Sequence, residues 1–191
     1  FDPDGGDPED PVTITGCVFE GFDSYGIDAN WIAMFNTTFT VTDNIFTDCD
    51  YGILAYGFED CTVNISGNRF ENCPSYGMEL GSMGNNASTV DVLVTDNEIV
   101  AESGSDCYAG IYIGNVEGET EISDNTITGD LEYGIFISKI GERGGNRVSA
   151  FIEKNEISVD GTGMNLGDLF GLISGDLTVR YNTIETNADD N

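Results

Sequence analysis

The sequence predicts an all-β solenoid of about seven coils, in which one structural unit is repeated along the chain. Three observations lead to this prediction. A short motif recurs at nearly constant spacing, two apolar columns accompany it in every copy, and a glycine turn follows each of the first six copies. A repeat of roughly 20–50 residues that covers nearly the whole chain is typical of solenoid proteins.

The recurring motif is a β-branched residue, two spacers, an asparagine, one spacer, and then Phe or Ile. Six copies read VTDNIF, ISGNRF, VTDNEI, ISDNTI, IEKNEI and VRYNTI, with their asparagines at Asn44, Asn68, Asn97, Asn125, Asn155 and Asn182. The earlier stretch ITGCVF fits the same frame with Cys17 in the asparagine position, which we call the slot. Counted from Cys17, successive slots are separated by 27, 24, 29, 28, 30 and 27 residues.

Two positions around the slot are apolar in all seven copies. Ile or Val stands three residues before it, and Phe or Ile stands two residues after it. Side chains of a strand alternate between its two faces, so both columns are expected to face inward. The glycine turns, such as Tyr25-Gly26-Ile27 and Tyr51-Gly52-Ile53, predict a second inward-facing strand in each repeat. A repeat of this length has room for a third strand, and no segment has a helical period.

The amino-acid composition excludes several classes of binding partner. The chain has 191 residues, with 6 Lys+Arg against 35 Asp+Glu, a formal net charge of -29 and a pI near 4.1. Such a surface repels nucleic acid and anionic lipid, and no apolar stretch approaches the ~20 residues of a membrane span. We expect an acidic arm over residues 1–11 and a single elongated domain over 12–191. High salt or divalent cations would relieve the self-repulsion of this domain, although a merely solubilising surface is the alternative.

Several features favour a location at the cell surface or outside the cell. The sequence starts at Phe1 and shows no signal peptide, which we interpret as a processed piece of something longer. Three Asn-x-Ser/Thr tripeptides, at Asn36, Asn64 and Asn86, are candidate glycosylation sites. The five cysteines would permit disulfides in such a compartment.

These patterns resemble the right-handed parallel β-helix repeat proteins of the pectate-lyase-like superfold, in their non-catalytic surface-protein form. The resemblance covers about residues 12–184 and depends on the Asn-x-[Ile/Phe] and Tyr-Gly-[Ile/Met] columns. It implies coils stacked at about 4.8 Å, and thus a core about 30 Å long. It also implies that the slot asparagines form a structural ladder, passing amide hydrogen bonds from coil to coil.

The resemblance does not extend to the catalytic motifs of that superfold. The absence of histidine removes the Gly-His-Gly motif of its hydrolases, and no Arg-x-Pro-x-x-Arg motif is present. Residues 25–30, Tyr-Gly-Ile-Asp-Ala-Asn, are similar to the Tyr-Gly-Phe-Asp-Pro-His of mannuronan epimerases. Ala29 and Asn30 replace the Pro and the catalytic His, so we predict no enzymatic activity.

Two groups of aspartates are candidate metal ligands, with calcium as the ion. Asp2, Asp4 and Asp7 lie in the acidic arm and resemble Asp-x-Asp-Gly calcium loops, although a flexible tether explains them equally. Asp96 and Asp124 precede their slots on coils expected to be neighbours. Like charges at adjacent positions are destabilising unless a metal cation bridges them. The alternative is that the positively charged side chain of Lys154 on the next coil compensates them.

The cysteines yield one geometric prediction. Cys49 and Cys73 fall five residues after their slots, and Cys107, like Cys49, falls three before a turn glycine. The three are expected to form a column at a separation that a disulfide tolerates. We predict one bridge among them, Cys49–Cys73 by preference, with a stack of buried free thiols as the alternative. Cys17 and Cys61 are candidates for free thiols or bonds between chains.

The sequence favours a structural function over catalysis. Our leading hypothesis is an extracellular subunit that assembles with copies of itself into a surface layer, sheath or filament. The alternative is a carbohydrate-binding or carbohydrate-active module, for which Trp31 and Tyr56 are the aromatic residues to inspect. The basic segment 139–154 could receive an anionic glycan or an acidic neighbour, or be an ordinary solvated loop.

Overall fold

The computed structural model describes residues 10–30, 34–81, 83–84, 88–105, 107–140, 148–168 and 176–186. Over these ranges the protein is built from β-strands with no helix, and the predicted fold class is confirmed. Within the same ranges, no helix is long and apolar enough to cross a membrane.

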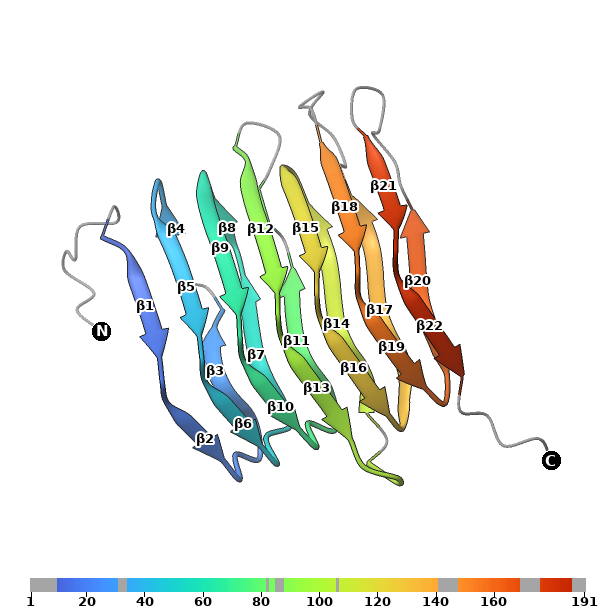
Figure 1. Cartoon of the computed structure of the whole chain (residues 1–191). Coiled ribbons are helices and arrows are strands. Elements are labelled where there is room, and N and C mark those ends of the chain that lie inside the picture. The colour runs from blue at the N-terminus through green and yellow to red at the C-terminus, as the bar shows by residue number, and fades with distance from the viewer. Residues whose placement is uncertain are drawn as a thin grey trace.

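The strands form three long sheets, each of which runs along the axis on which the coils are stacked (Figure 1). The first sheet contains β1 (Val12–Thr15), β5 (Thr38–Thr42), β9 (Cys61–Ser66), β12 (Val90–Thr95), β15 (Glu119–Ser123), β18 (Ser149–Glu153) and β21 (Leu177–Arg180). The second contains β2 (Val18–Glu20), β6 (Ile45–Thr47), β10 (Arg69–Glu71), β13 (Glu98–Ala101), β16 (Thr126–Gly129), β19 (Glu156–Val159) and β22 (Thr183–Thr186). The third contains β3 (Tyr25–Ala29), β7 (Tyr51–Tyr56), β11 (Tyr76–Gly81), β14 (Cys107–Val116), β17 (Leu131–Ile140) and β20 (Thr162–Asp168). A small sheet pairs β4 (Met34–Phe35) with β8 (Phe58–Glu59).

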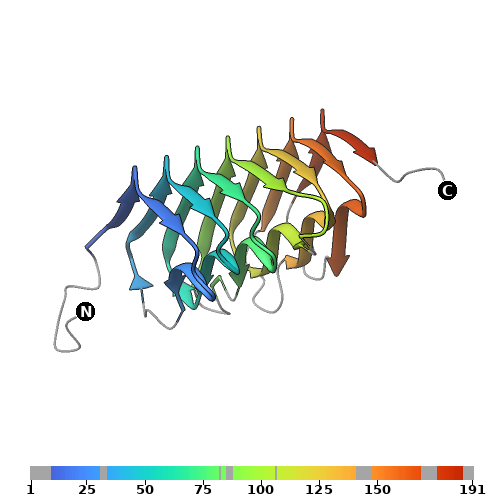
Figure 2. The same cartoon turned by 90° about the horizontal axis from the view of Figure 1, so that it is seen from below.

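The pairings in the long sheets are parallel and keep the predicted columns in register. In the first sheet Ile14 pairs with Val41, and in the second Phe46 pairs with Phe70, which pairs in turn with Ile99. Each of the first six coils therefore contributes one strand to each sheet, and the last described coil contributes β21 and β22 to the first and second sheets. Figure 2 shows this succession of coils in a second view, with the colours following the chain order along the rod.

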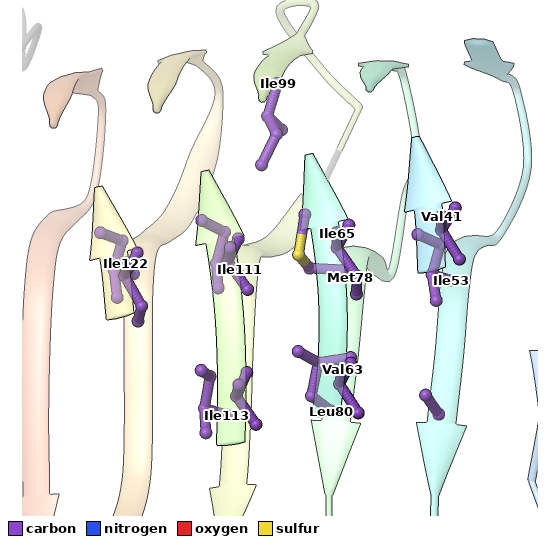
Figure 3. Packing of buried hydrophobic residues seen from close by; sticks show 14 of the residues in the cluster. Val41, Ile53, Val63, Ile65, Met78, Leu80, Ile99, Ile111, Ile113 and Ile122 are labelled. Carbon is purple, nitrogen blue, oxygen red and sulfur yellow. The ribbon is translucent and has the colours of Figure 1, made fainter. Parts of the chain in front are cut away.

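The core fills the space enclosed by the sheets. Side chains of equivalent positions in successive coils lie side by side in rows along the axis, as the labelled residues of Figure 3 show. Phe46 is fully buried, and its ring stacks at 4.8 Å on Phe19 and at 4.7 Å on Phe70. From the fourth coil onward isoleucine replaces phenylalanine in this column. Each inward residue is thus covered by its equivalents in the neighbouring coils.

The core packing requires the glycines of the Tyr-Gly column, because no other residue fits at these positions. A Cβ atom on Gly52 would lie 2.5 Å from Cδ1 of Phe70, and one on Gly134 would lie 2.6 Å from Cγ2 of Ile157. The same Cβ atoms would also collide with the carbonyl oxygen of the glycine in the next coil. The glycine column therefore makes room for the Phe/Ile column of the second sheet. The turn predicted at these glycines was wrong, since they lie inside strands of the third sheet.

The slot asparagines form the hydrogen-bonded ladder expected from the sequence. Asn97 Oδ1 accepts from the backbone N–H of Asn68 at 3.0 Å and from its Nδ2 at 3.1 Å. Asn97 Nδ2 donates to Asn125 Oδ1 at 3.0 Å and to the Ile65 carbonyl at 2.9 Å. The pattern recurs from Asn44 to Asn182. It satisfies the buried polar groups at the bend between the first and second sheets.

Cys17 marks where the ladder begins. Its backbone N–H donates to Asn44 Oδ1 at 2.9 Å, as the N–H of each slot from Asn44 to Asn155 does to the next asparagine. Its thiol has no amide group, so the Nδ2-to-Oδ1 hydrogen bond that joins later slots is missing between Cys17 and Asn44, and Sγ contacts the Thr15 carbonyl at 3.5 Å instead.

Candidate functional site

The outer face of the third sheet carries a continuous row of aromatic side chains. We call this row the aromatic strip, and its members are Tyr25, Tyr51, Tyr76, Tyr108, Tyr112, Tyr133 and Phe136. All seven are half-buried and lie outside the hydrophobic core cluster. Successive ring centroids along the axis are 5.1, 5.2, 5.4 and 5.3 Å apart, within the range of favourable aromatic pairs. The strip crosses five coils, a length of about 19 Å at the usual strand spacing.

The glycines that follow the tyrosines explain why these rings face outward. The glycine and the residue after it point into the core, so the tyrosine that precedes the glycine lies on the outside. Tyr25 pairs in register with Tyr51, and Tyr51 with Tyr76. In the fourth coil Ala109 occupies this register, but the neighbouring Tyr108 places its ring between those of Tyr76 and Tyr133.

One carboxylate is embedded beside the strip. Glu79 of β11 is half-buried, in register with Leu54 and Tyr112, and it accepts a hydrogen bond from the Tyr56 phenol. Burial raises the pKa of the Glu79 carboxyl, and the hydrogen bond from Tyr56 offsets part of that shift. Burial and the nearby Glu79 charge also raise the pKa of the Tyr76 phenol. The phenols of Tyr56 and Tyr76 therefore remain protonated at neutral pH, beside the Glu79 acceptor.

An open acidic pocket adjoins the strip where the chain turns from the second sheet into the third. It has a volume of about 560 Å³ and is lined by Phe22, Asp23, Asp48, Asp50, Asn72, Pro74, Glu102, Ser103, Gly104 and Ser105. Asp50 directly precedes Tyr51 of the strip and accepts a hydrogen bond from Ser75 Oγ at 2.6 Å. The strip thus borders a hollow with several carboxylates.

Sequence reasoning identified the tyrosine-glycine column and singled out Tyr56, but it missed the strip. It took Tyr-Gly only as a turn signal, and did not consider which way the tyrosine points. The clue for Tyr108 and Tyr112 was their alternation with buried residues in β14, which puts both on the outer face. Trp31, the other aromatic residue singled out, lies outside the described residues.

The aspartates before the slots have a conformational role. Asp96 and Asp124 are exposed and adopt left-handed φ angles of 56° and 57°, as does Lys154 at 56°. Aspartate tolerates this region better than most residues, and the turn requires it in every coil. Lys154 Nζ lies 3.5 Å from Asp124 Oδ2, which is the compensation weighed as the alternative to a cation. No group of three or more metal-binding side chains occurs in the described ranges, and Asp2, Asp4 and Asp7 lie outside them.

The cysteine prediction requires a correction. All five cysteines are free thiols in the structure, so the bridge predicted among Cys49, Cys73 and Cys107 is not formed. The trio is buried on adjacent coils, and the Cys49 thiol donates weakly to the Thr47 carbonyl at 3.5 Å. Burial raises the pKa of Cys73 and of Cys107 to about 12. A disulfide forms through a thiolate, which this apolar setting disfavours.

The candidate glycosylation sites occupy different settings. Asn36 is exposed in a turn, whereas Asn64 lies half-buried in the middle of β9 between two paired strands. A strand held on both sides does not offer the surface loop that such acceptors occupy. Asn86 lies outside the described residues, as do Arg143 and Arg147 of the basic segment.

Fold and repeat together define the class: the chain is a right-handed parallel β-helix repeat protein. Comparison with protein families then shows that it belongs to the NosD family, described as periplasmic copper-binding protein (NosD). The family model matches residues 6–149 and, in a second alignment, residues 62–190. Two overlapping matches are expected when a repeated pattern can be aligned in more than one register. No curated protein and no solved structure matches the chain.

Proposed function

We propose that this chain is a β-solenoid located outside the cytoplasm that binds a carbohydrate polymer along the aromatic strip. The location is supported by the family description, which assigns NosD proteins to the periplasm. The binding function rests on one observation, the row of half-buried aromatic rings on the third sheet. A sheet face that exposes contiguous apolar surface is a common mark of an interaction site.

Carbohydrate chemistry fits this surface better than a purely apolar partner does. Tyrosine combines a flat apolar ring with a polar hydroxyl, and sugars present both C–H faces and hydroxyl groups. Binding sites of this kind combine aromatic walls with a few placed polar groups. The phenols and the Glu79 carboxylate would supply those groups here, and the regular coil spacing suits an extended chain lying along the axis.

The family name refers to copper, but the described residues do not fit a copper site. Copper in proteins takes imidazole, thiolate or thioether ligands. The chain has no histidine. The thioethers of Met78 and Met83 and the trio of thiols are buried in the core, and no three Cys, Asp or Glu side chains of the described ranges gather in a way that could hold a metal ion. We therefore do not extend copper binding to this chain.

Replacing Tyr76 by alanine tests the proposal, because Tyr76 lies in the middle of the strip, where its ring pairs with those of Tyr51, Tyr108 and Tyr112. We expect Tyr76→Ala to weaken binding about 30-fold, since truncating a central aromatic contact typically costs about 2 kcal/mol. Affinity electrophoresis through gels containing plant and bacterial polysaccharides would identify a ligand, and calorimetry would measure the change.

Tyr181→Ala is the matched control. Tyr181 is 74% exposed and lies in a turn of the last described coil, outside the strip. It should bind as the unaltered protein does. Equal losses in the two variants, or none in Tyr76→Ala, would reject the strip as the binding surface.

Self-assembly is the second candidate, and the outermost described coils favour it. Ile184 in the inward column of β22 is 50% exposed, and Phe19 in the same column of β2 is half-buried, whereas Phe46 between them in that column is fully buried. Ile184 and Phe19 belong to edge strands of the second sheet, whose backbone groups can recruit another strand. Stacking on copies of the same chain would bury these side chains and extend the rod into a filament, sheath or layer.

Sedimentation of the protein at high concentration, with salt and calcium present, tests this second candidate. We expect assemblies that Ile184→Lys dissociates, because a charge would be buried at the stacked end. Ile45→Lys is the control, since Ile45 is 41% exposed on the outer face of β6, away from both ends. A single monomeric species under these conditions would contradict self-assembly.

A further inference from the structure

We propose that the polymer bound along the aromatic strip carries protonated amino groups, and that Glu79 selects them. The ligand class is then an amino-sugar polymer of the glucosamine type. This inference rests on the proposed carbohydrate-binding function and adds the charge of the ligand to it.

The first argument is the charge of the whole chain. At a formal net charge of -29, the protein repels uronic-acid polymers and attracts cationic ones. Neutral sugars are neither attracted nor repelled. The long-range field therefore ranks the three classes of polysaccharide, with amino-sugar polymers first.

The second argument is the position of Glu79 within the strip. Its carboxylate is half-buried and accepts from Tyr56, which is contributed by the preceding coil. Its charge also acts on the phenols of Tyr51 and Tyr76. A carboxylate that is partly withdrawn from water interacts more strongly with a cation than an exposed one does. An ammonium group of the ligand at this point would neutralise the negative charge of Glu79, because the aromatic rings of the strip carry no positive charge.

The aromatic rings favour the same ligand. The rings of Tyr76 and Tyr112 meet at 5.4 Å with an interplanar angle of 65°, beside the register position of Glu79. Aromatic faces attract ammonium groups through their quadrupoles. The neighbouring pocket adds the carboxylates of Asp48 and Asp50 along the path of an extended chain. Stacking, cation–π attraction and charge pairing thus coincide on one face.

Calorimetry with two oligomers tests the inference: a glucosamine oligomer and its fully N-acetylated counterpart, which has the same ring and linkage without the charge. We expect the unaltered protein to bind the glucosamine oligomer about tenfold more tightly, the effect of one hydrogen bond to a charged group. Glu79→Gln should abolish this preference, so that the two oligomers bind with equal affinity. The glutamine amide can still accept from Tyr56, so the fold is retained.

Glu156→Gln is the matched control, since Glu156 is exposed on β19 of the second sheet and its change removes the same charge. It should keep the preference, whereas equal losses in both variants would show only the general attraction of a polycation to an acidic chain. Equal binding of the two oligomers by the unaltered protein would overturn the amino-sugar inference and leave the carbohydrate proposal standing. Binding of oligolysine but of neither sugar oligomer would overturn both.

Discussion

Replacing Asn97 by alanine should lower the free energy of unfolding by about 3–5 kcal/mol, the largest effect expected from a single change on the ladder. The amide of Asn97 joins three coils, since it accepts from Asn68 and donates to Asn125 and to the Ile65 carbonyl. Its loss leaves the Asn68 N–H and the Ile65 carbonyl without these partners. Each buried group left without a partner costs about 1–3 kcal/mol. Urea unfolding would measure the change.

Two other asparagines serve as controls. Asn64→Ala removes the same group from the outer face of β9, where the side chain is half-buried, and should cost less than about 1 kcal/mol. Asn182→Ala removes the last described member of the ladder, which is less buried than Asn97, and should fall between the two. If all three variants unfolded at the same urea concentration, the ladder would not stabilise the rod.

Gly52→Ala, which adds one methyl group, should lower the free energy of unfolding by about 3 kcal/mol, at the upper end of ordinary overpacking. The new Cβ would lie 2.5 Å from the Phe70 ring and would also collide with the backbone carbonyl of Gly77. The ring cannot move away, because Phe46 stacks on it at 4.7 Å. Relief therefore requires separating two coils, which weakens their strand pairing. Thermal and urea unfolding of Gly52→Ala would show the loss.

Gly114→Ala tests whether the loss comes from packing or from glycine itself. Gly114 also lies in a strand of the third sheet, but the nearest atom to its Cβ would be the Gly81 Cα at 3.1 Å, with the next at 3.5 Å. We expect a change within about 1 kcal/mol. If Gly114→Ala were as damaging as Gly52→Ala, the glycine column would be needed for its backbone and not for the Phe/Ile column.

Much of the fold could be predicted because each repeat presents the same side chains to the same neighbours. The asparagine slot, the Ile/Val column before it and the Phe/Ile column after it were readable from spacing alone, and they stack as expected. Stacking in register converts a sequence period directly into contacts. The candidate site was less predictable, since it depends on residues that depart from the period.

Tyr56 and Glu79 illustrate that departure. They are 23 residues apart, fewer than any interval between slots, and they meet because Tyr56 reaches across to the next coil. In the fourth coil Ala109 is the residue paired with Tyr76, but the strip continues through Tyr108, one residue earlier in the sequence. Loops of different length separate the strands, so the order of residues does not say which side chains become neighbours across coils. Only the three-dimensional arrangement decides this.

The sequence by itself determined that this protein is a β-solenoid with a recurring asparagine slot, inward apolar columns on both sides of it and a strongly acidic surface. These properties follow from period and composition, which need no knowledge of contacts between distant positions. The tertiary structure decided that the tyrosines before the glycines form one outer strip, that Glu79 lies beside it, and that the three stacked cysteines are buried free thiols. The reason is physical: the direction in which a side chain points, and its exposure to water, are set by the backbone and by the neighbouring coils.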